Sequence, residues 1–568
     1  MKILPISLLA LASLPAFAQM AMDHPAQPAN SAAPERLGTV SFSVSCKAAA
    51  QAPFNRGVAL LHDFWYEEAQ RQFERIAQAD PACAMAHWGA AMSYFHQIWS
   101  RPGESAMARG WAEMQKAQSP PAKTARERAY IAALTGFYRA GTRGFPERVQ
   151  AYSDAMGSLY AQVPDDIDAG AFYALSLLAA EPTGDTSLAA ERKAMEVLAP
   201  LFARYPDHPG LDHYVIHSCD NPAMAAQGLA AATHYGAIAS SGAHACHMPG
   251  HIYARLGMWP QDIEANLCSV AAAQAAQAKY GSGIMDQPHA YDFLLYAYLQ
   301  SGQDDRAKWV LAQTAPLLDQ IASMPAMAGQ RMEGMVPFYR SKYAVFYALE
   351  MRDWKSASAL EPPADSPPRD ATMAIWARAI AHGHLLQPED ARADLVRYDA
   401  LIDQVRKGKH AYEADDTGAR IERSEVLGWV AFAEGKQDDA LKNLRAAADL
   451  QDQVGQAEVD IPAREMLADM LLEFHRPRQA SAEYEVALRL SPNRFNGLYH
   501  AGLAAEQAGE TPKARQYYAA LLNSTNNGSQ SARPEFAHVK SYLSSSQAVA
   551  IGSPGRYSGS PVALAGRR

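Results

Sequence analysis

Pairs of histidines recur in this chain at a spacing of 34 residues, and this spacing constrains the fold more than any other feature. His213 and His217 are four residues apart, and His247 and His251 repeat the pair 34 residues later. Residues four apart share one face of an α-helix, with about 5–6 Å between their Cβ atoms. A period of about 34 residues is typical of a repeated helix–turn–helix unit. We therefore expect stacked helical units, in which equivalent residues of successive units become neighbours.

The same spacing recurs near the start of the chain. His62 and Trp65 are matched by His96 and Trp99, each 34 residues further on. Two separate regions thus place histidines at equivalent positions of successive units.

Composition and motifs exclude several other classes of protein. The formal net charge is −9 and charges of both signs are interspersed, so no basic stripe indicates nucleic-acid binding. No apolar run reaches the roughly 18–20 residues of a membrane span. The sequence has no strand-like alternation long enough for a sheet, and no glycine-rich nucleotide loop or HExxH motif. We predict an all-α fold.

Four segments are predicted along the chain. Residues 1–18 combine one lysine, an apolar stretch and a small-residue cleavage site at their end, which is typical of a secretory signal peptide and indicates a periplasmic or secreted protein. Residues 19–48 are rich in alanine, proline and methionine, and we expect a flexible extension. Residues 49–545 form the helical array. The Ser/Gly-rich residues 546–568 are expected to be a disordered tail.

Export makes disulfide bonds possible. Cys46 precedes the first unit and Cys83 lies at its end, so we predict a bridge between them. Cys219 and Cys246 flank the histidine pairs. They are open to three interpretations: a bridge, metal ligation, or burial as small apolar residues.

Small and large residues at fixed offsets define the unit further. Gly57, Leu60, Ala69, Phe73 and Pro81 fall where the tetratricopeptide pattern has glycine, a large residue, alanine, phenylalanine and proline. Here the chain resembles the tetratricopeptide repeat family, and similar matches continue to about residue 525. The segments LLHDFWYEEA, FHQIW, DHYVIH, HACHMPGHIYARLGMW and QPHAYDFLLYAYLQ resemble a subgroup of exported bacterial tetratricopeptide proteins with HxxxH motifs. The resemblance implies a right-handed superhelical solenoid whose first helices line a concave groove.

The resemblance also directs the second, fifth and ninth positions of each unit's first helix into that groove. In three successive units these positions contain His213 and His217, then His244, His247 and His251, then His289, Asp292 and Tyr296. The predicted metal ligands are His213, His217, His247, His251, His289 and Asp292. Further candidates for the groove are His244, Tyr296, His62 and His96. Imidazole and carboxylate ligands suit Cu, Zn, Fe or Ni.

Two functions remain open from the sequence. In the first, the protein is a scaffold whose histidine-rich groove binds a protein or peptide segment. In the second, it is a metal-dependent enzyme acting on a small-molecule substrate, or a transition-metal-binding protein.

Overall fold

The structure, a computed structural model, describes residues 34–98, 101–119, 121–139, 141, 144–182, 184–324, 334–408, 411–414 and 416–551. These residues contain helices and no strand, which confirms the all-α prediction. The described residues from Arg36 onward belong to one compact unit. The predicted signal peptide lies outside the described residues, as do Trp99 and the tail beyond residue 551.

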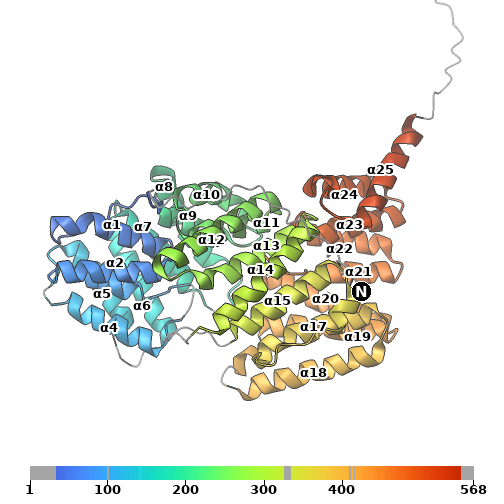
Figure 1. Cartoon of the computed structure of the whole chain (residues 1–568), viewed down its shortest axis with the longest axis horizontal. Coiled ribbons are helices and arrows are strands. Elements are labelled where there is room, and N and C mark those ends of the chain that lie inside the picture. Colours follow the sequence, from blue (N-terminus) through green and yellow to red (C-terminus); the bar gives the residue numbers. More distant parts are fainter. Residues whose placement is uncertain are drawn as a thin grey trace, which may run out of the picture. The chain divides into compact units, whose positions relative to one another are not determined.

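Consecutive helices pack against one another in neighbouring pairs (Figure 1). The described residues form α1 (Gln51–His62), α2 (Tyr66–Ala79), α3 (Ala84–Met92), α4 (Glu104–Ala117), α5 (Ala125–Tyr138), α6 (Phe145–Gln162), α7 (Ile167–Ala179), α8 (Ala189–Arg204), α9 (Pro209–Cys219), α10 (Ala225–Ile238), α11 (Ala243–Arg255), α12 (Trp259–Tyr280), α13 (Gln287–Gln300), α14 (Asp304–Ala322), α15 (Met335–Glu350), α16 (Trp354–Ser358), α17 (Pro368–His384), α18 (Pro388–Lys407), α19 (Thr417–Ala433), α20 (Gln437–Val454), α21 (Ala463–Glu473), α22 (Pro477–Leu490), α23 (Phe495–Gln507), α24 (Thr511–Ser524) and α25 (Glu535–Ile551). Short 3-10 helices cover Ala48–Ala50, Ile284–Asp286, Ala411–Ala414 and Asn526–Gly528.

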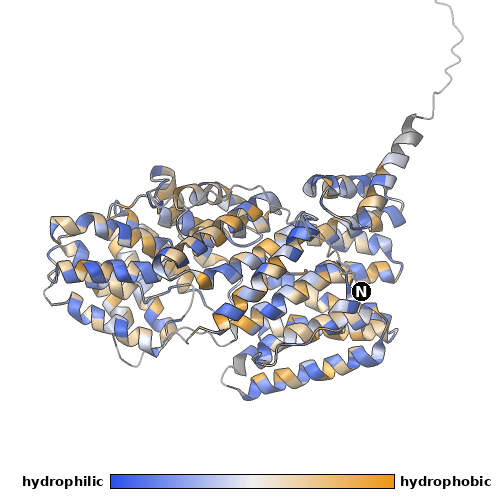
Figure 2. Cartoon of the chain, in the orientation of Figure 1, coloured by the Kyte–Doolittle hydropathy of each residue, from blue (hydrophilic) through white to orange (hydrophobic). Residues whose placement is uncertain are grey.

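Individual helices are amphipathic, so hydrophilic and hydrophobic residues alternate along the ribbons (Figure 2). In α2, Ala69, Phe73 and Ile76 are buried, while Arg75 on another face is exposed. Their spacing of four and three residues gives α2 one apolar stripe. Burying that stripe requires a partner helix, which explains the packing in pairs.

One tight turn recurs between the two helices of a pair. It has three residues, and the middle one adopts a left-handed conformation, for example Gly257 between α11 and α12 with φ of +62°. The next backbone N–H then donates to a carbonyl five residues earlier, as Met258 does to Tyr253 at 2.8 Å. This is the hydrogen-bond pattern of a Schellman cap. The middle residues of these turns are Phe64, Gly257, Gly302, Arg352, Leu386, Gly435, His475 and Gly509.

The segment before the first helix is packed rather than flexible over its described part. Phe42 is fully buried, with its ring centroid 5.6 Å from that of Trp88 and 5.3 Å from that of Phe54. The prediction of a flexible extension over 19–48 is therefore wrong for residues 34–48, because their apolar side chains complete the core of the first helices. At the other end, α25 continues to Ile551, into the predicted tail.

The predicted disulfide between Cys46 and Cys83 is present. A second bridge, not expected from the sequence, joins Cys246 on α11 to Cys268 on α12. Cys219 is a free, buried thiol. Of the interpretations left open by the sequence, burial therefore applies to Cys219 and a bridge to Cys246. Among the described residues, no helix combines the length and apolar character needed to cross a bilayer.

Candidate metal centre

Six histidines from three helices gather into two groups of three. The first triad consists of His213 and His217 from α9 with His244 from α11. The second triad consists of His247 and His251 from α11 with His289 from α13. Within each triad, one ring nitrogen of every histidine lies within 4.8 Å of the other two. The 34-residue shift therefore translates into two adjacent, equivalent groups.

In the first triad, His213 occupies the central position. Its Nε2 lies 3.0 Å from Nε2 of His217 and 3.0 Å from Nε2 of His244. Its Nδ1 lies 2.5 Å from the backbone carbonyl oxygen of His62. Because a carbonyl can only accept, Nδ1 must carry the proton, and Nε2 of the neutral ring presents its lone pair to the other two rings.

The second triad has the same arrangement, with different supporting groups. Nε2 of His247 lies 2.9 Å from Nε2 of His251, and the His289 ring centroid is 4.4 Å from that of His247. Nδ1 of His247 donates to Oδ1 of Asn266 at 2.6 Å. The amide of Asn266 is oriented by Asp262, whose Oδ1 accepts from Nδ2 at 2.7 Å. Nε2 of His247 is therefore also left as a lone pair.

Two carboxylates hold the other nitrogen of His251. Nδ1 lies 2.9 Å from Asp220 Oδ2 and 3.2 Å from Glu458 Oε1. Arg255 pairs with both carboxylates, at 3.0 Å to Asp220 and 3.2 Å to Glu458. This guanidinium already supplies positive charge to the pair, so the carboxylates orient His251 and do not form a separate cation site.

Outer hydrogen bonds of this kind are typical of histidines that ligate a metal. A ligating histidine almost always donates its second ring N–H to a carboxylate, a carbonyl or a water molecule, which fixes the tautomer and the ring orientation. His213, His247 and His251 each do so, through a carbonyl, an amide oxygen and a pair of carboxylates respectively. Nε2 atoms therefore converge in both triads, those of His213, His217 and His244 in the first and those of His247 and His251 in the second.

One phenylalanine ring covers each triad. The ring centroid of Phe64 lies 4.4, 5.7 and 5.2 Å from those of His213, His217 and His244. Phe293 lies 4.7, 4.9 and 5.3 Å from the three rings of the second triad. Phe64 occupies the left-handed turn position with φ of +55°, which costs a non-glycine residue about 1–2 kcal/mol. In this strained conformation the Phe64 ring packs against the histidines of the first triad.

Burial keeps most of the rings neutral. Removal from water lowers the pKa of His213 and that of His289 to about 3. It also holds the pKa values of His217, His244 and His247 well below the ordinary value. Burial would lower the pKa of His251 too, but Asp220 and Glu458 outweigh it and raise that pKa to about 10. Neutral imidazoles are the form that binds metal ions.

Four other candidates from the sequence lie outside both triads. Asp292 is buried in an ion pair with Lys342 at 2.6 Å, and Tyr296 donates to the backbone carbonyl of Asp460 at 2.8 Å. The Nε2 of His96 bonds the carbonyl of Ser93 at 3.0 Å, and its ring stacks on Tyr66. Among these candidates, only His62 touches a triad, through its backbone carbonyl.

The side chain of His62 belongs to a buried group behind the first triad. Its Nδ1 lies 2.9 Å from the Tyr214 hydroxyl and its Nε2 lies 3.0 Å from Asp168 Oδ1. His208 shares the same carboxylate oxygen at 3.3 Å. Hydrogen bonding accounts for these contacts, and they fix the position of His62, whose carbonyl orients His213.

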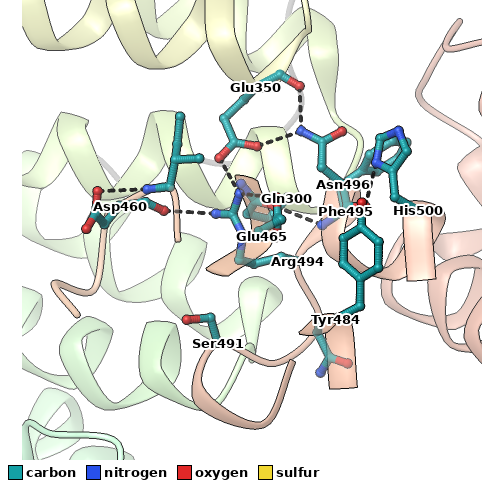
Figure 3. Close-up of polar contacts among 12 residues, drawn as sticks. Gln300, Glu350, Asp460, Glu465, Tyr484, Ser491, Arg494, Phe495, Asn496 and His500 are labelled. Carbon is teal, nitrogen blue, oxygen red and sulfur yellow. Dashed lines mark hydrogen bonds and ion pairs between the residues drawn. The ribbon is translucent and has the colours of Figure 1, made fainter. Parts of the chain in front are cut away.

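The loop that supplies Glu458 is anchored by a buried arginine (Figure 3). Arg494 is 1% exposed and donates to the carbonyl of Asp460, 2.9 Å away, in the loop between α20 and α21. It also pairs with Glu465 at 2.9 Å and with Glu350 at 2.8 Å. The C-terminal helices thereby hold Glu458 against His251.

Sequence reasoning missed the residues that support the ligands. Asn266, Asp220 and Glu458 follow no repeat spacing, and Glu458 is 207 residues from His251. Phe293 had a local signal, since it lies four residues after His289 on the same helix. For Phe64 the sequence signal is its place in the segment LLHDFWYEEA, two residues after His62.

Gly250 allows Asn266 to approach α11, and this gives a test of the packing. A Cβ atom at position 250 would lie 2.8 Å from Asn266 Nδ2 and 2.8 Å from Asp262 Oδ1, whereas one at Gly236 would meet only Pro249 at 3.8 Å. We expect Gly250→Ala to lower the free energy of unfolding by about 1–3 kcal/mol through overpacking. Gly236→Ala should be neutral or stabilising, since alanine favours helix. Equal denaturant midpoints for both variants would contradict this placement.

Comparison with known proteins adds no identification, since no family model matches the chain and no curated protein is similar to it.

Proposed function

We propose that the protein binds two transition-metal ions, one at each histidine triad. The observation that carries this proposal is the opposed orientation of the ring nitrogens: Nε2 atoms converge, while Nδ1 atoms of His213, His247 and His251 are turned outward to oxygen acceptors. Neighbouring Nε2 atoms lie 2.9–3.0 Å apart, and one proton at most can lie between the two nitrogens of each pair. A shared metal ion satisfies all their lone pairs at once.

The ligand set favours copper and zinc over the other candidates. Imidazole is a borderline ligand that suits Zn, Cu, Fe and Ni, and Cu(II) binds such sites most tightly among the divalent ions. Both triads offer nitrogen ligands only. A site with three protein ligands also keeps an open coordination position, as catalytic zinc sites do and structural ones do not. The metal ion at each triad can therefore also bind an exogenous ligand.

The alternative function, a groove that binds a peptide, has weaker support. Histidines that contact a peptide need exposed ring nitrogens. His213 and His247 are 0% and 2% exposed, and their nitrogens face other residues of the chain.

We further infer that the helix pairs are tetratricopeptide units in a right-handed superhelix, and that the protein is exported. The 34-residue spacing and the recurring Schellman turn support the first inference. Two disulfide bonds support the second, because such bonds persist in oxidising compartments.

Metal analysis of the purified protein tests the proposed function. After removal of metal by a chelator, the protein is challenged separately with Cu, Zn, Ni, Co and Fe and then desalted. We expect about two equivalents of copper or zinc per chain by mass spectrometry. A protein that retains no metal after any of these challenges would overturn the proposal.

A further inference from the structure

We propose that the two triads act as one binuclear centre and that a single small anion, inorganic or carboxylate, binds between the two metal ions. This inference rests on the proposed binding of two metals. It adds a ligand class and a shared binding position, which two independent metal sites would not have.

The closeness of the triads is the first argument. His244 of the first triad and His247 of the second lie one helical turn apart on α11, and their ring centroids are 6.3 Å apart. Separations inside the first triad are similar, from 4.7 Å for His213 and His217 to 6.2 Å for His217 and His244. The separation between the triads is thus about the same as the widest separation inside the first triad, and a polyatomic anion can span it.

Open coordination is the second argument. Among the described residues, no fourth side chain places a ligand atom within 4.8 Å of all three converging nitrogens of either triad. The group of Asp220, His251 and Glu458 engages the opposite nitrogen of His251. Phe64 and Phe293 add apolar surface and no donor atom. Each metal would therefore keep a position for an external ligand.

Charge is the third argument. All six ligands bind a metal as neutral imidazoles, His251 after losing the proton that Asp220 and Glu458 favour. Two divalent ions would therefore bring four positive charges into a buried region, where like charges repel strongly. The carboxylates of Asp220 and Glu458 contact His251, and the guanidinium of Arg255 pairs with both and offsets one of their charges. These three side chains contribute at most one net negative charge. A bridging anion supplies the missing charge and relieves the repulsion between the metals.

Azide binding to the copper-loaded protein tests the proposal. Azide is a small anion with two terminal donor atoms, and its charge-transfer absorption reports binding to Cu(II). We expect wild-type protein with two coppers to bind one azide, with loss of the electron paramagnetic resonance signal as the bridged ions couple. His217→Ala and His289→Ala each remove a ligand from one triad, and each should retain one copper and bind azide about 100-fold more weakly.

The controls separate the two proposals. Copper content is measured for every sample, and circular dichroism confirms that each variant is folded; His244→Ala replaces His217→Ala if the latter fails to fold. Two azides per wild-type chain, or unchanged azide affinity in the one-copper variants, would mean independent sites and overturn the bridging proposal while two-metal binding stands. No azide binding at full copper occupancy would overturn it as well. Absence of copper from the wild-type protein would instead defeat the proposed function itself.

Discussion

Alanine at both position 213 and position 247 is expected to abolish metal binding, reducing about two equivalents per chain to none. Each substitution removes the histidine whose Nε2 lies closest to its triad partners, at 2.9–3.0 Å. Each triad then keeps two histidines and has lost its third ligand. The measurement is metal content of the desalted double variant, with helical content followed by circular dichroism.

His500→Ala provides the matched control for this double variant. His500 is also a buried helical histidine, 9% exposed, and its Nδ1 bonds a backbone carbonyl at 2.9 Å, as His213 does. It lies on α23, outside both triads. We expect its replacement to leave metal content unchanged. Retention of metal by the double variant, with the control also loaded, would show that the metal binds elsewhere.

Arg494→Met is expected to be the most destabilising single substitution proposed for this chain, lowering the free energy of unfolding by about 3–5 kcal/mol. Methionine fills similar volume but leaves Glu350 and Glu465 buried at 2% and 3% exposure without their cation. An uncompensated buried charge accounts for the large cost. Denaturant unfolding of the variant measures it.

Two further variants test this explanation. Arg423 pairs with Asp399 at 2.7 Å, but both side chains are more than 40% exposed, so Arg423→Met should cost less than about 1 kcal/mol. In the Arg494→Met background, Glu350→Gln removes one stranded charge and should recover part of the lost stability. Similar losses for both arginine variants would contradict the role assigned to the buried cluster.

The histidine triads were largely predictable because their positions follow the period of the helix pairs. The spacing of four residues placed His213 with His217 and His247 with His251, and the 34-residue shift made the pairs neighbours. Asp292 shows where this reasoning ends. It shares the fifth position with His247, yet Lys342 from α15 captures its carboxylate at 2.6 Å. The position of a residue within the repeat unit predicts the direction in which its side chain points. It does not predict which partner a later helix supplies.

The supporting contacts were not predictable for a related reason. Asn266 reaches His247 only because Gly250 leaves room for it, and Glu458 reaches His251 from a loop between distant helices. Neither follows from periodicity, since both depend on how non-adjacent elements pack. The described part of the N-terminal segment was misassigned because its composition resembles a linker, whereas Phe42 is fully buried.

Contacts between distant helices change how the array should unfold. In a simple solenoid each unit touches only its neighbours, so the ends can melt while the centre stays folded. Here Trp259 donates to the carbonyl of Asn493 at 2.8 Å, and Arg533 pairs with Asp304 at 2.8 Å. Such links across more than 200 residues tie the fate of the last helices to that of α11–α14. Melting should be cooperative over this region, so that shortening the chain at its C-terminal end loosens the histidine-bearing helices as well.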